Sequence, residues 1–303
     1  MKPFMSFALA IAVLCVFGSD AGATQKKFDR KFTVAPGGTL TIATDAGSVK
    51  IIGGAGSEVS VQADIKGREK DVNRFEVTAE QTGNNVEVKG KAGKSGSSWF
   101  WGGTELDVEF VITVPREYHL KMNTSGGNLV VSDVKGTIRG ETSGGNIDLG
   151  GTEGEVDMET SGGNIRAEKC TGKIHMETSG GEIRIQSITG DVEVETSGGN
   201  VKVADVEGKV HAETSGGDVV VKVKGSNKGI FAETSGGNID IVIPKAVNAN
   251  IDAATSGGEV HCDLPVTLSG KIDESRVKGT LNGGGNTIHA HTSGGDVRIR
   301  AAD

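Results

Sequence analysis

The sequence predicts an all-β protein that winds as a single-stranded parallel β-helix, or β-solenoid, with about 18 residues per coil. Two observations lead to this prediction. The tetrapeptide Thr-Ser-Gly-Gly recurs at a nearly constant spacing, and apolar residues alternate with polar residues between its copies. The composition agrees, since glycine is abundant (48 residues) whereas proline (5 residues) and aromatic residues (4%) are scarce. This composition is unlike collagen and supplies little aromatic surface for a conventional globular core.

The tetrapeptide occurs nine times. The first six copies are 18 residues apart, and the later gaps are 20, 21 and 37 residues. We interpret the last gap as about two coils, with Gly283-Gly284-Gly285 as a degenerate turn. The threonines of the nine copies are Thr124, Thr142, Thr160, Thr178, Thr196, Thr214, Thr234, Thr255 and Thr292.

Each repeat contains two short segments with a period of two. Ile183 and Ile185 flank Arg184, and Val192-Glu193-Val194 follows the next glycine. This alternation is typical of a strand with one buried face. Each repeat therefore predicts two strands and two turns, and we expect the Ser-Gly-Gly glycines to allow a positive φ. A lone coil buries too little apolar surface to be stable, so the coils must stack and fold as one array.

The first 23 residues have the pattern of a secretory signal peptide. Met1-Lys2 is a basic start, residues 4–17 form an apolar run, and Ala21-Gly22-Ala23 supplies small residues for cleavage. The alternative is a buried N-terminal helix. We therefore expect an exported protein that resides in the periplasm, at the outer membrane or outside the cell. No second apolar stretch of about 20 residues follows, so we expect no transmembrane segment in the mature chain.

We expect residues 24–303 to form a single β-solenoid domain. Residues 124–303 carry the regular repeats, and residues 24–123 read as irregular N-terminal coils and a cap. Within the latter, Asp45-Ala46-Gly47-Ser48 looks like a degenerate first coil. A cap is needed because an open end would expose strand edges and apolar surface. A separate small β-sandwich is the alternative for residues 24–123.

Three segments of the N-terminal region carry a resemblance to a known family. They are Phe32-Thr33-Val34 with Gly37-Gly38, then Leu40-Thr41-Ile42, and Ile112-Thr113-Val114-Pro115 before the first Ser-Gly-Gly turn. With the repeats, this pattern resembles the bacterial putative-adhesin family of β-strand-repeat proteins, a domain of unknown function. The resemblance implies a surface location and a binding role, and it supplies no catalytic residues.

Two candidate contact sites follow from the stacking. Glutamate precedes the tetrapeptide in six copies, so these side chains form one acidic strip. The strip could bind divalent cations, but a solvated outward face is favoured, because one column lacks the 6–8 oxygens that calcium takes. Trp99, Phe100 and Trp101 form either an exposed contact for a glycan, partner or membrane interface, or a folded-back cap. The strip consists of Glu141, Glu159, Glu177, Glu195, Glu213 and Glu233.

Histidine and cysteine suggest no further chemistry, so we predict no catalytic, cofactor or metal site. His175 and His211 share a column, but two coils separate them, about 9.6 Å, too far for one zinc ion. The remaining histidines read as surface residues. Cys170 and Cys262 should be buried free thiols, about five coils apart and beyond disulfide range. The remaining histidines are His119, His261, His289 and His291.

The leading functional prediction is a non-enzymatic secreted or envelope-exposed protein, an adhesin or a binding scaffold, whose partner is an unknown envelope protein or a glycan. A structural or stress-related envelope component that binds proteins is the alternative. A carbohydrate-active β-helix enzyme is the least favoured, because connections are short in residues 124–237 and only residues 244–286 could wall a cleft. The net charge of −8 disfavours nucleic acid and anionic lipid as partners. The oligomeric state stays open.

Overall fold

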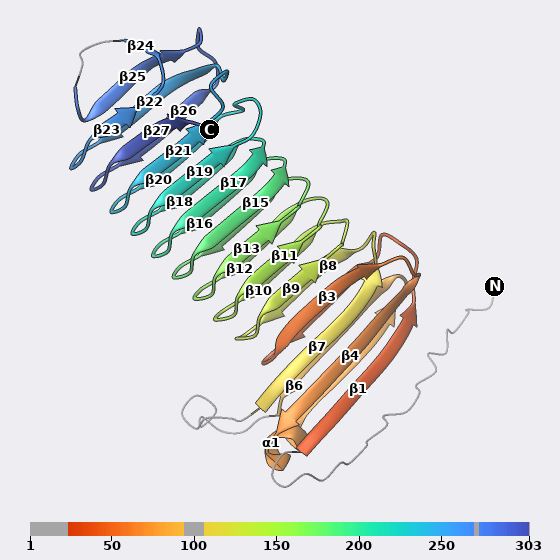
Figure 1. Cartoon of the computed structure of the whole chain (residues 1–303). Helices are drawn as coiled ribbons and strands as arrows, with labels where there is room; N and C mark the ends of the chain where they lie inside the picture. Colours follow the sequence, from red (N-terminus) through yellow and green to blue (C-terminus); the bar gives the residue numbers. More distant parts are fainter. Residues whose placement is uncertain (1–23, 94–105, 270–272, 303) are drawn as a thin grey trace, which may run out of the picture.

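The structure is a computed structural model that describes residues 24–93, 106–269 and 273–302. It shows an elongated all-β solenoid with two long sheets back to back (Figure 1). The predicted all-β class is confirmed. The described residues contain one helix, α1 (Glu69–Arg74), at the N-terminal end of the solenoid. Nowhere in these residues does a helix have the length and apolar character that a membrane crossing requires.

The two sheets run the length of the molecule. In spatial order, sheet A contains β1 (Thr24–Thr33), β4 (Glu58–Gly67), β7 (Leu106–Pro115), β3 (Ser48–Gly54), β9 (Leu129–Ser132), β11 (Ile147–Gly150), β13 (Ile165–Glu168), β15 (Ile183–Thr189), β17 (Val201–Glu207), β19 (Val219–Val223), β21 (Ile239–Ile243), β27 (Val297–Ala301) and β23 (Val260–Cys262). Sheet B contains β24 (Val266–Leu268), β25 (Arg276–Leu281), β22 (Ala249–Thr255), β26 (Thr287–Thr292), β20 (Ile230–Thr234), β18 (Val210–Thr214), β16 (Val192–Thr196), β14 (Ile174–Thr178), β12 (Val156–Thr160), β10 (Ile138–Thr142), β8 (His119–Thr124), β2 (Thr39–Thr44), β6 (Asn85–Ala92) and β5 (Phe75–Thr82).

Successive repeats lie directly over one another in the middle of the solenoid. In sheet A, Ile147 pairs in parallel with Ile165, which pairs with Ile183. In sheet B, Ile174 pairs in parallel with Val192. These partners are 18 residues apart, the spacing of the tetrapeptide, so the side chains at each repeat position form a column. The aliphatic columns face inward and form the core between the sheets.

The threonine of each tetrapeptide is a buried hydrogen-bonding residue. Thr178 is 1% exposed, and its Oγ1 donates to the carbonyl oxygen of Gly163 in the preceding coil at 2.9 Å. The same oxygen accepts the backbone N–H of Gly181 at 3.2 Å. The pattern recurs along the stack, so the threonine hydroxyl both closes its own turn and joins adjacent coils.

Substituting Thr178 by valine should lower the free energy of unfolding by about 1–3 kcal/mol, because the Gly163 carbonyl and the Gly181 N–H would lose their buried partner. Thr178→Ser keeps the hydroxyl and is the control. Urea unfolding followed by circular dichroism measures both variants. A valine variant as stable as the serine variant would contradict the role of the hydroxyl.

The expected positive φ at the Ser-Gly-Gly turns is wrong. Neither Gly180 nor Gly181 adopts a positive φ, and the left-handed conformations occur instead at the second turn, for example at Gly172 with φ of 127°. The second glycine of the tetrapeptide is required for another reason. A Cβ at Gly181 would lie 1.8 Å from the carbonyl oxygen of Gly163, so only glycine permits this close approach of the coils.

The N-terminal region extends both sheets. Thr44 pairs with Thr124, so residues 39–54 form a first coil, as the Asp45-Ala46-Gly47-Ser48 segment predicts. The chain then leaves this coil to form α1 and longer strands, several of them antiparallel, and returns at β8. Because β7 pairs with β3 and β6 pairs with β2, the hydrogen-bonded sheets are continuous with the repeats. This continuity differs from a separate sandwich.

The C-terminal region departs from sequence order. Strands β26 and β27 are the last in the chain, yet they lie between the coil of β20–β21 and the coil of β22–β23. Hydrogen bonds repeat this order, because the Asp296 N–H donates to Asn238 Oδ1 and the Glu259 N–H donates to Asp296 Oδ1, both at 2.9 Å. Interpreting the gap of 37 residues as two successive coils is therefore wrong.

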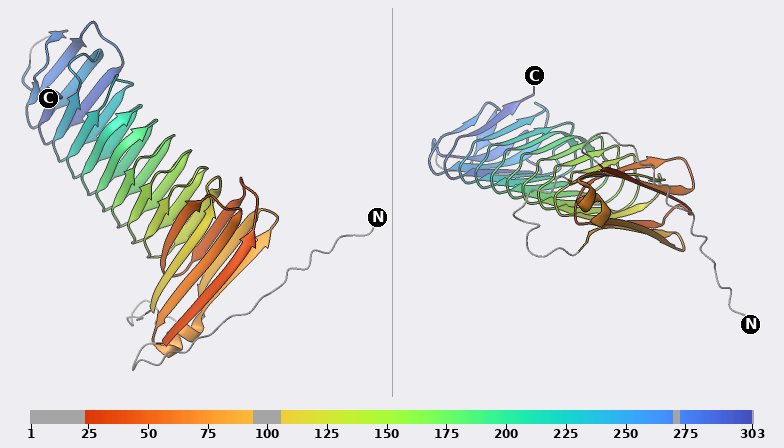
Figure 2. Two further views of the ribbon diagram at one scale, coloured as in Figure 1. Left: turned by 45° about the vertical axis from the view of Figure 1, so that its right-hand side comes forward. Right: turned by 90° about the horizontal axis from the view of Figure 1, so that it is seen from below.

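Residues 263–286 instead form the end of the solenoid. Strands β24 and β25 pair antiparallel, and β25 pairs antiparallel with β22 (Figure 2). The antiparallel strands cover the edge that β22 would otherwise expose. Gly283 and Gly284 adopt φ of 87° and 83° in the return from β25 to the inserted coil.

Both cysteines are free, as expected, but only Cys170 is fully buried, and Cys262 is half-buried. Cys262 lies at the far end of sheet A on β23, whereas Cys170 follows β13. Six strand positions separate the two strands because of the inserted coil, or roughly 29 Å. Burial raises the pKa of the Cys262 thiol.

Candidate binding groove and histidine cluster

The outward face of sheet B presents two columns of polar side chains. The second column contains the six glutamates of the acidic strip, which pair in register along six neighbouring parallel strands. Consecutive members are therefore about 4.8 Å apart at the backbone. In spatial order they are Glu141, Glu159, Glu177, Glu195, Glu213 and Glu233, and His291 of β26 comes next.

Four of these glutamates line a groove, which we call the acidic groove. Glu177, Glu195, Glu213 and Glu233 share it with a row of serines from the adjoining turns and with His291 at one end, and its volume is about 520 Å³. Glu141 and Glu159 continue the column outside the groove. In the described part of the chain, no lysine or arginine forms an ion pair with the four groove glutamates. The serines are Ser197, Ser215, Ser235, Ser256 and Ser293.

The first column is aromatic near the C-terminal end. The ring of Phe231 stacks between those of His211 and His289, with centroid distances of 4.5 and 4.6 Å. Toward the N-terminal end, the column continues with Glu193 and His175, which lie 3.8 Å apart. Alternation along each strand places this column beside the glutamates, so imidazoles and carboxylates lie on one face.

A second groove of about 520 Å³ flanks the aromatic column on the side away from the glutamates. Lys173, Lys209 and Lys228 line it together with Phe231 and His289. The two grooves therefore differ in charge, and only the acidic groove is lined by a row of like charges without cationic partners.

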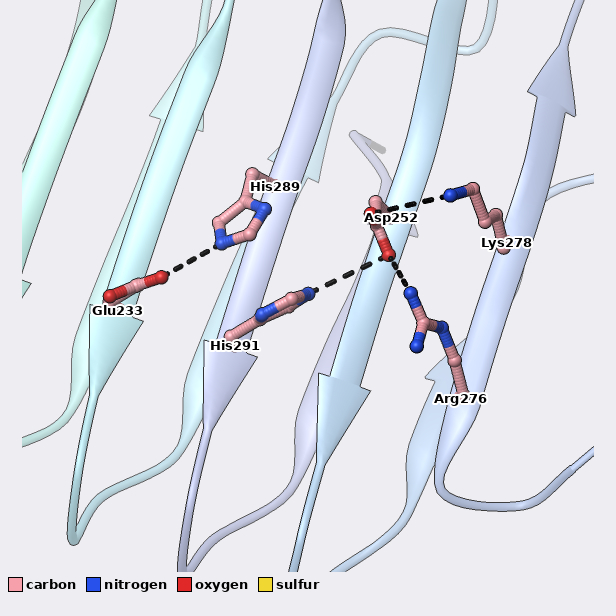
Figure 3. Close-up of polar contacts among 6 residues, drawn as sticks. All are labelled: Glu233, Asp252, Arg276, Lys278, His289 and His291. Atoms are coloured by element: carbon pink, nitrogen blue, oxygen red, sulfur yellow. Dashed lines mark hydrogen bonds and ion pairs between the residues drawn. The ribbon is translucent and has the colours of Figure 1, made fainter.

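The inserted coil gathers a histidine cluster at the end of the acidic groove. His289 and His291 both lie on the outward face of β26, and Glu233 lies on the adjacent strand β20 (Figure 3). One ligand atom from each of the three residues lies within 4.8 Å of the other two. His289 Nε2 is 2.8 Å from Glu233 Oε1, and the two imidazole centroids are 3.8 Å apart. The three residues could hold a metal ion.

Asp252 lies on the other side of the histidines. Its Oδ1 is 3.2 Å from Nη2 of Arg276 and 3.6 Å from Nε2 of His291, and its Oδ2 is 3.9 Å from Nζ of Lys278 (Figure 3). Burial opposes ionisation of Asp252, but Arg276 and Lys278 outweigh it and lower the pKa of the carboxyl. Asp252 is therefore an anionic group fixed beside the histidines.

The environment of His291 favours its neutral form. Burial lowers the pKa of His291, and the neighbouring His289 lowers it further, against the opposing effect of Asp252. Its Nε2 atom is buried and makes no hydrogen bond within the described residues, since the 3.6 Å to Asp252 is too long. A neutral imidazole is the form that ligates metals.

A related cluster occurs two coils toward the N-terminus. Glu195, His211 and Glu213 also bring three ligand atoms within 4.8 Å of one another. His211 Nε2 lies 2.8 Å from Glu213 Oε1. The second position on the strand is here a glutamate instead of a histidine, so this cluster offers one imidazole and two carboxylates.

The other candidate residues lie apart from this face or outside the description. Trp99, Phe100 and Trp101 lie outside the described residues. His261 is on sheet A, 3.2 Å from Glu259, and the His119 Nδ1 accepts the Thr137 N–H at 3.0 Å.

Sequence reasoning placed the glutamate strip but missed the cluster. The segment His289-Ala290-His291 carried a usable signal, because alternation puts both rings on one face of a strand. The contact with Glu233, 56 residues away, depends on the inserted coil.

Comparison with known proteins agrees with the resemblance noted in the sequence. None of the curated proteins compared with the chain matches it. Three solved structures illustrate what it is similar to. A putative adhesin from Bacteroides fragilis is 16% identical and has a TM-score of 0.46, with 91% of this chain and 97% of that chain covered. A putative lipid binding protein from Parabacteroides distasonis is 14% identical with a TM-score of 0.43, and 90% and 97% are covered. A putative adhesin from Parabacteroides distasonis is 12% identical with a TM-score of 0.41, and 91% and 97% are covered.

The family match extends over most of the sequence. Residues 38–300 match the family described as Toastrack DUF4097, from the first coil to the end of β27. The segments that carried the resemblance at Leu40-Thr41-Ile42 and Ile112-Thr113-Val114-Pro115 fall within this match. The chain therefore belongs to the Toastrack DUF4097 family.

Proposed function

We propose that the chain is an exported, non-enzymatic binding protein of the bacterial envelope whose acidic groove holds an extended, positively charged segment of a partner protein. Residues 1–23 would direct export, and residues 24–303 would act as a single solenoid domain, with successive 18-residue coils in its regular part. The observation that carries the proposal is the row of four groove glutamates without lysine or arginine partners.

The electrostatics of the groove favour a polycation. Two carboxylates at 4.8 Å in water repel by about 0.9 kcal/mol, so each neighbouring pair raises the energy of the empty groove. A ligand with several cationic groups relieves several of these repulsions at once. The four carboxylates span about 14 Å, from three strand spacings, which matches about four residues of extended peptide.

The shape of the groove also favours an extended ligand. Its volume of about 520 Å³ is formed along successive turns of one edge, and the lining is carboxylate and hydroxyl. The threonine hydroxyls in the lining are engaged in the turns, as Thr196 Oγ1 donates to Gly181 O at 2.9 Å. The groups left to meet a ligand are therefore the glutamates and the serines.

Replacing Glu177 and Glu195 together by glutamine should weaken binding of fluorescein-labelled tetralysine about tenfold at low salt, since two exposed charge pairs are lost. Fluorescence anisotropy measures the affinity. The matched control replaces Glu141 and Glu159, which share the column but lie outside the groove. Wild-type affinity should fall as salt rises, because exposed charges are screened.

Equal loss in the two double variants would contradict a role for the groove. A neutral oligosaccharide panel run beside tetralysine tests the rival ligand class. Glycan binding lost in Glu177→Gln/Glu195→Gln, with no tetralysine binding, would favour the glycan-binding alternative. Release of reducing sugar would favour a carbohydrate-active enzyme, and loss of envelope integrity without either ligand would favour a structural component.

A further inference from the structure

We propose that Glu233, His289 and His291 form a binding site for a divalent first-row transition ion, with Zn²⁺ as the foremost candidate, at the end of the acidic groove. The inference concerns three side chains and does not depend on what occupies the rest of the groove.

The fold brings these residues together from distant parts of the sequence. Alternation along β26 places the two histidines on the outward face, with Ala290 between them facing the core. The insertion of β26 beside β20 then pairs His291 with Glu233 and His289 with Phe231. Phe231 stacks on His289 and limits the rotation of that ring. Two imidazoles and one carboxylate therefore converge from two strands whose register is fixed by the core.

The spacing of the donor atoms is close to what zinc requires. Zinc bonds of about 2.0–2.1 Å in a tetrahedral site place ligand atoms roughly 3.4 Å apart. The three donor atoms already lie within 4.8 Å of one another, and His289 Nε2 is 2.8 Å from Glu233 Oε1. Side-chain rotations of a few tenths of an ångström to about 1 Å would complete the geometry, without movement of the strands.

The donor set fits zinc better than calcium or magnesium. Two histidines and one glutamate are a known zinc donor set that leaves the fourth position open. Imidazole nitrogen suits zinc, copper and nickel, whereas calcium and magnesium prefer oxygen. The open position would face the groove, because Glu233 and His291 both line it.

A carboxylate stands where a zinc-bound histidine commonly needs one. Nε2 of His291 points toward Asp252, and Nδ1 is left on the side of Glu233 and His289 (Figure 3). Ligating histidines usually donate their other ring N–H to a carboxylate, which fixes the ring. Asp252 is held in turn by Arg276 and Lys278. This arrangement gives the buried Nε2 atom a partner once the ring moves by a few tenths of an ångström.

The related cluster supplies an internal comparison. Glu195, His211 and Glu213 have the same placement on β16 and β18, but only one imidazole. Each lost histidine weakens a zinc site, so this cluster should bind zinc more weakly. The two clusters are on the same face, in the same charge environment, which makes His211 a matched control for His291.

Isothermal titration calorimetry of the full chain, purified without a polyhistidine tag, tests the site with ZnCl₂. We expect one tight Zn²⁺ per chain and a rise in melting temperature that MgCl₂ and CaCl₂ do not reproduce. His291→Gln and Glu233→Gln should each lower zinc affinity at least about tenfold, whereas His211→Gln should leave it unchanged. Circular dichroism verifies that each variant is folded, and either ligand variant suffices for the test.

Cobalt gives an independent reading of geometry. Co²⁺ at the site should show the intense visible absorption of a four-coordinate nitrogen and oxygen environment, and Zn²⁺ should displace it. The proposal is overturned if no zinc binds, if both ligand variants keep wild-type affinity, or if His211→Gln removes the binding. Tetralysine binding measured in the presence of EDTA separates a failure of the groove from a failure of this site.

Discussion

Replacing Gly181 by alanine is expected to lower the free energy of unfolding by about 3–5 kcal/mol, a large effect for one methyl group. The added Cβ would lie 1.8 Å from the Gly163 carbonyl oxygen and 2.5 Å from its carbon. Both are backbone atoms in the preceding coil, so no flexible side chain can move away. The coils must separate locally, and the neighbouring Thr178 hydrogen bonds would weaken with them.

Gly180→Ala is the matched control for this substitution. A Cβ there would find its nearest neighbour, the Ser161 carbonyl oxygen, at 3.7 Å, which is ordinary contact. Neither glycine has a positive φ, so conformational strain does not distinguish them. Thermal and urea unfolding followed by circular dichroism compare the variants. Similar stabilities for the two alanine variants would contradict the close approach of the coils.

Replacing Ile299 by aspartate should destabilise the C-terminal coils by about 3–5 kcal/mol, because the new carboxylate would be buried without a partner. Ile299 is fully buried in β27, between Ile241 of β21 and Cys262 of β23. A solenoid can open from one end, so the loss should be local. Arg298→Asn, on the outward face of the same strand, should have little effect.

The two native thiols report where the structure opens. Cys262 lies directly beside Ile299, and Cys170 lies near the middle of the solenoid. In Ile299→Asp, alkylation of Cys262 under native conditions should accelerate at least about tenfold while Cys170 stays protected, as expected for local opening. Mass spectrometry of the alkylated peptides measures both rates at one pH. Unchanged Cys262 labelling would argue against the inserted position of β27.

The sequence predicted what depends on local pattern. The alternation of Ile183, Arg184 and Ile185 and the spacing of 18 residues predicted the strands, their buried faces and the glutamate column. The helix α1 was not predicted, since six residues are too few to display a helical period. The tetrapeptide was recognised as a turn, but the reason for Gly181 lies in the contact with Gly163 of another coil. A turn motif alone does not contain that contact.

The order of the last coils could not be predicted from periodicity. Val260 and Val297 have the same alternating surroundings, and either would fit beside Ile239 of β21. Which of them pairs there is decided by the antiparallel strands β24 and β25 and by the return of the chain at Gly283 and Gly284. The histidine cluster depends on this order, so its residues looked like separate surface positions in the sequence.

The regular middle of the solenoid lets the molecule change its length without redesign. Because the coils from β8 to β21 share one register, duplication of an 18-residue unit there would leave the N-terminal strands and the inserted coil with their present neighbours. Each added coil would lengthen the molecule by about 4.8 Å. It would also add one glutamate and one serine to the row beside the turns, so gene duplication could match the number of charges to a longer or shorter partner.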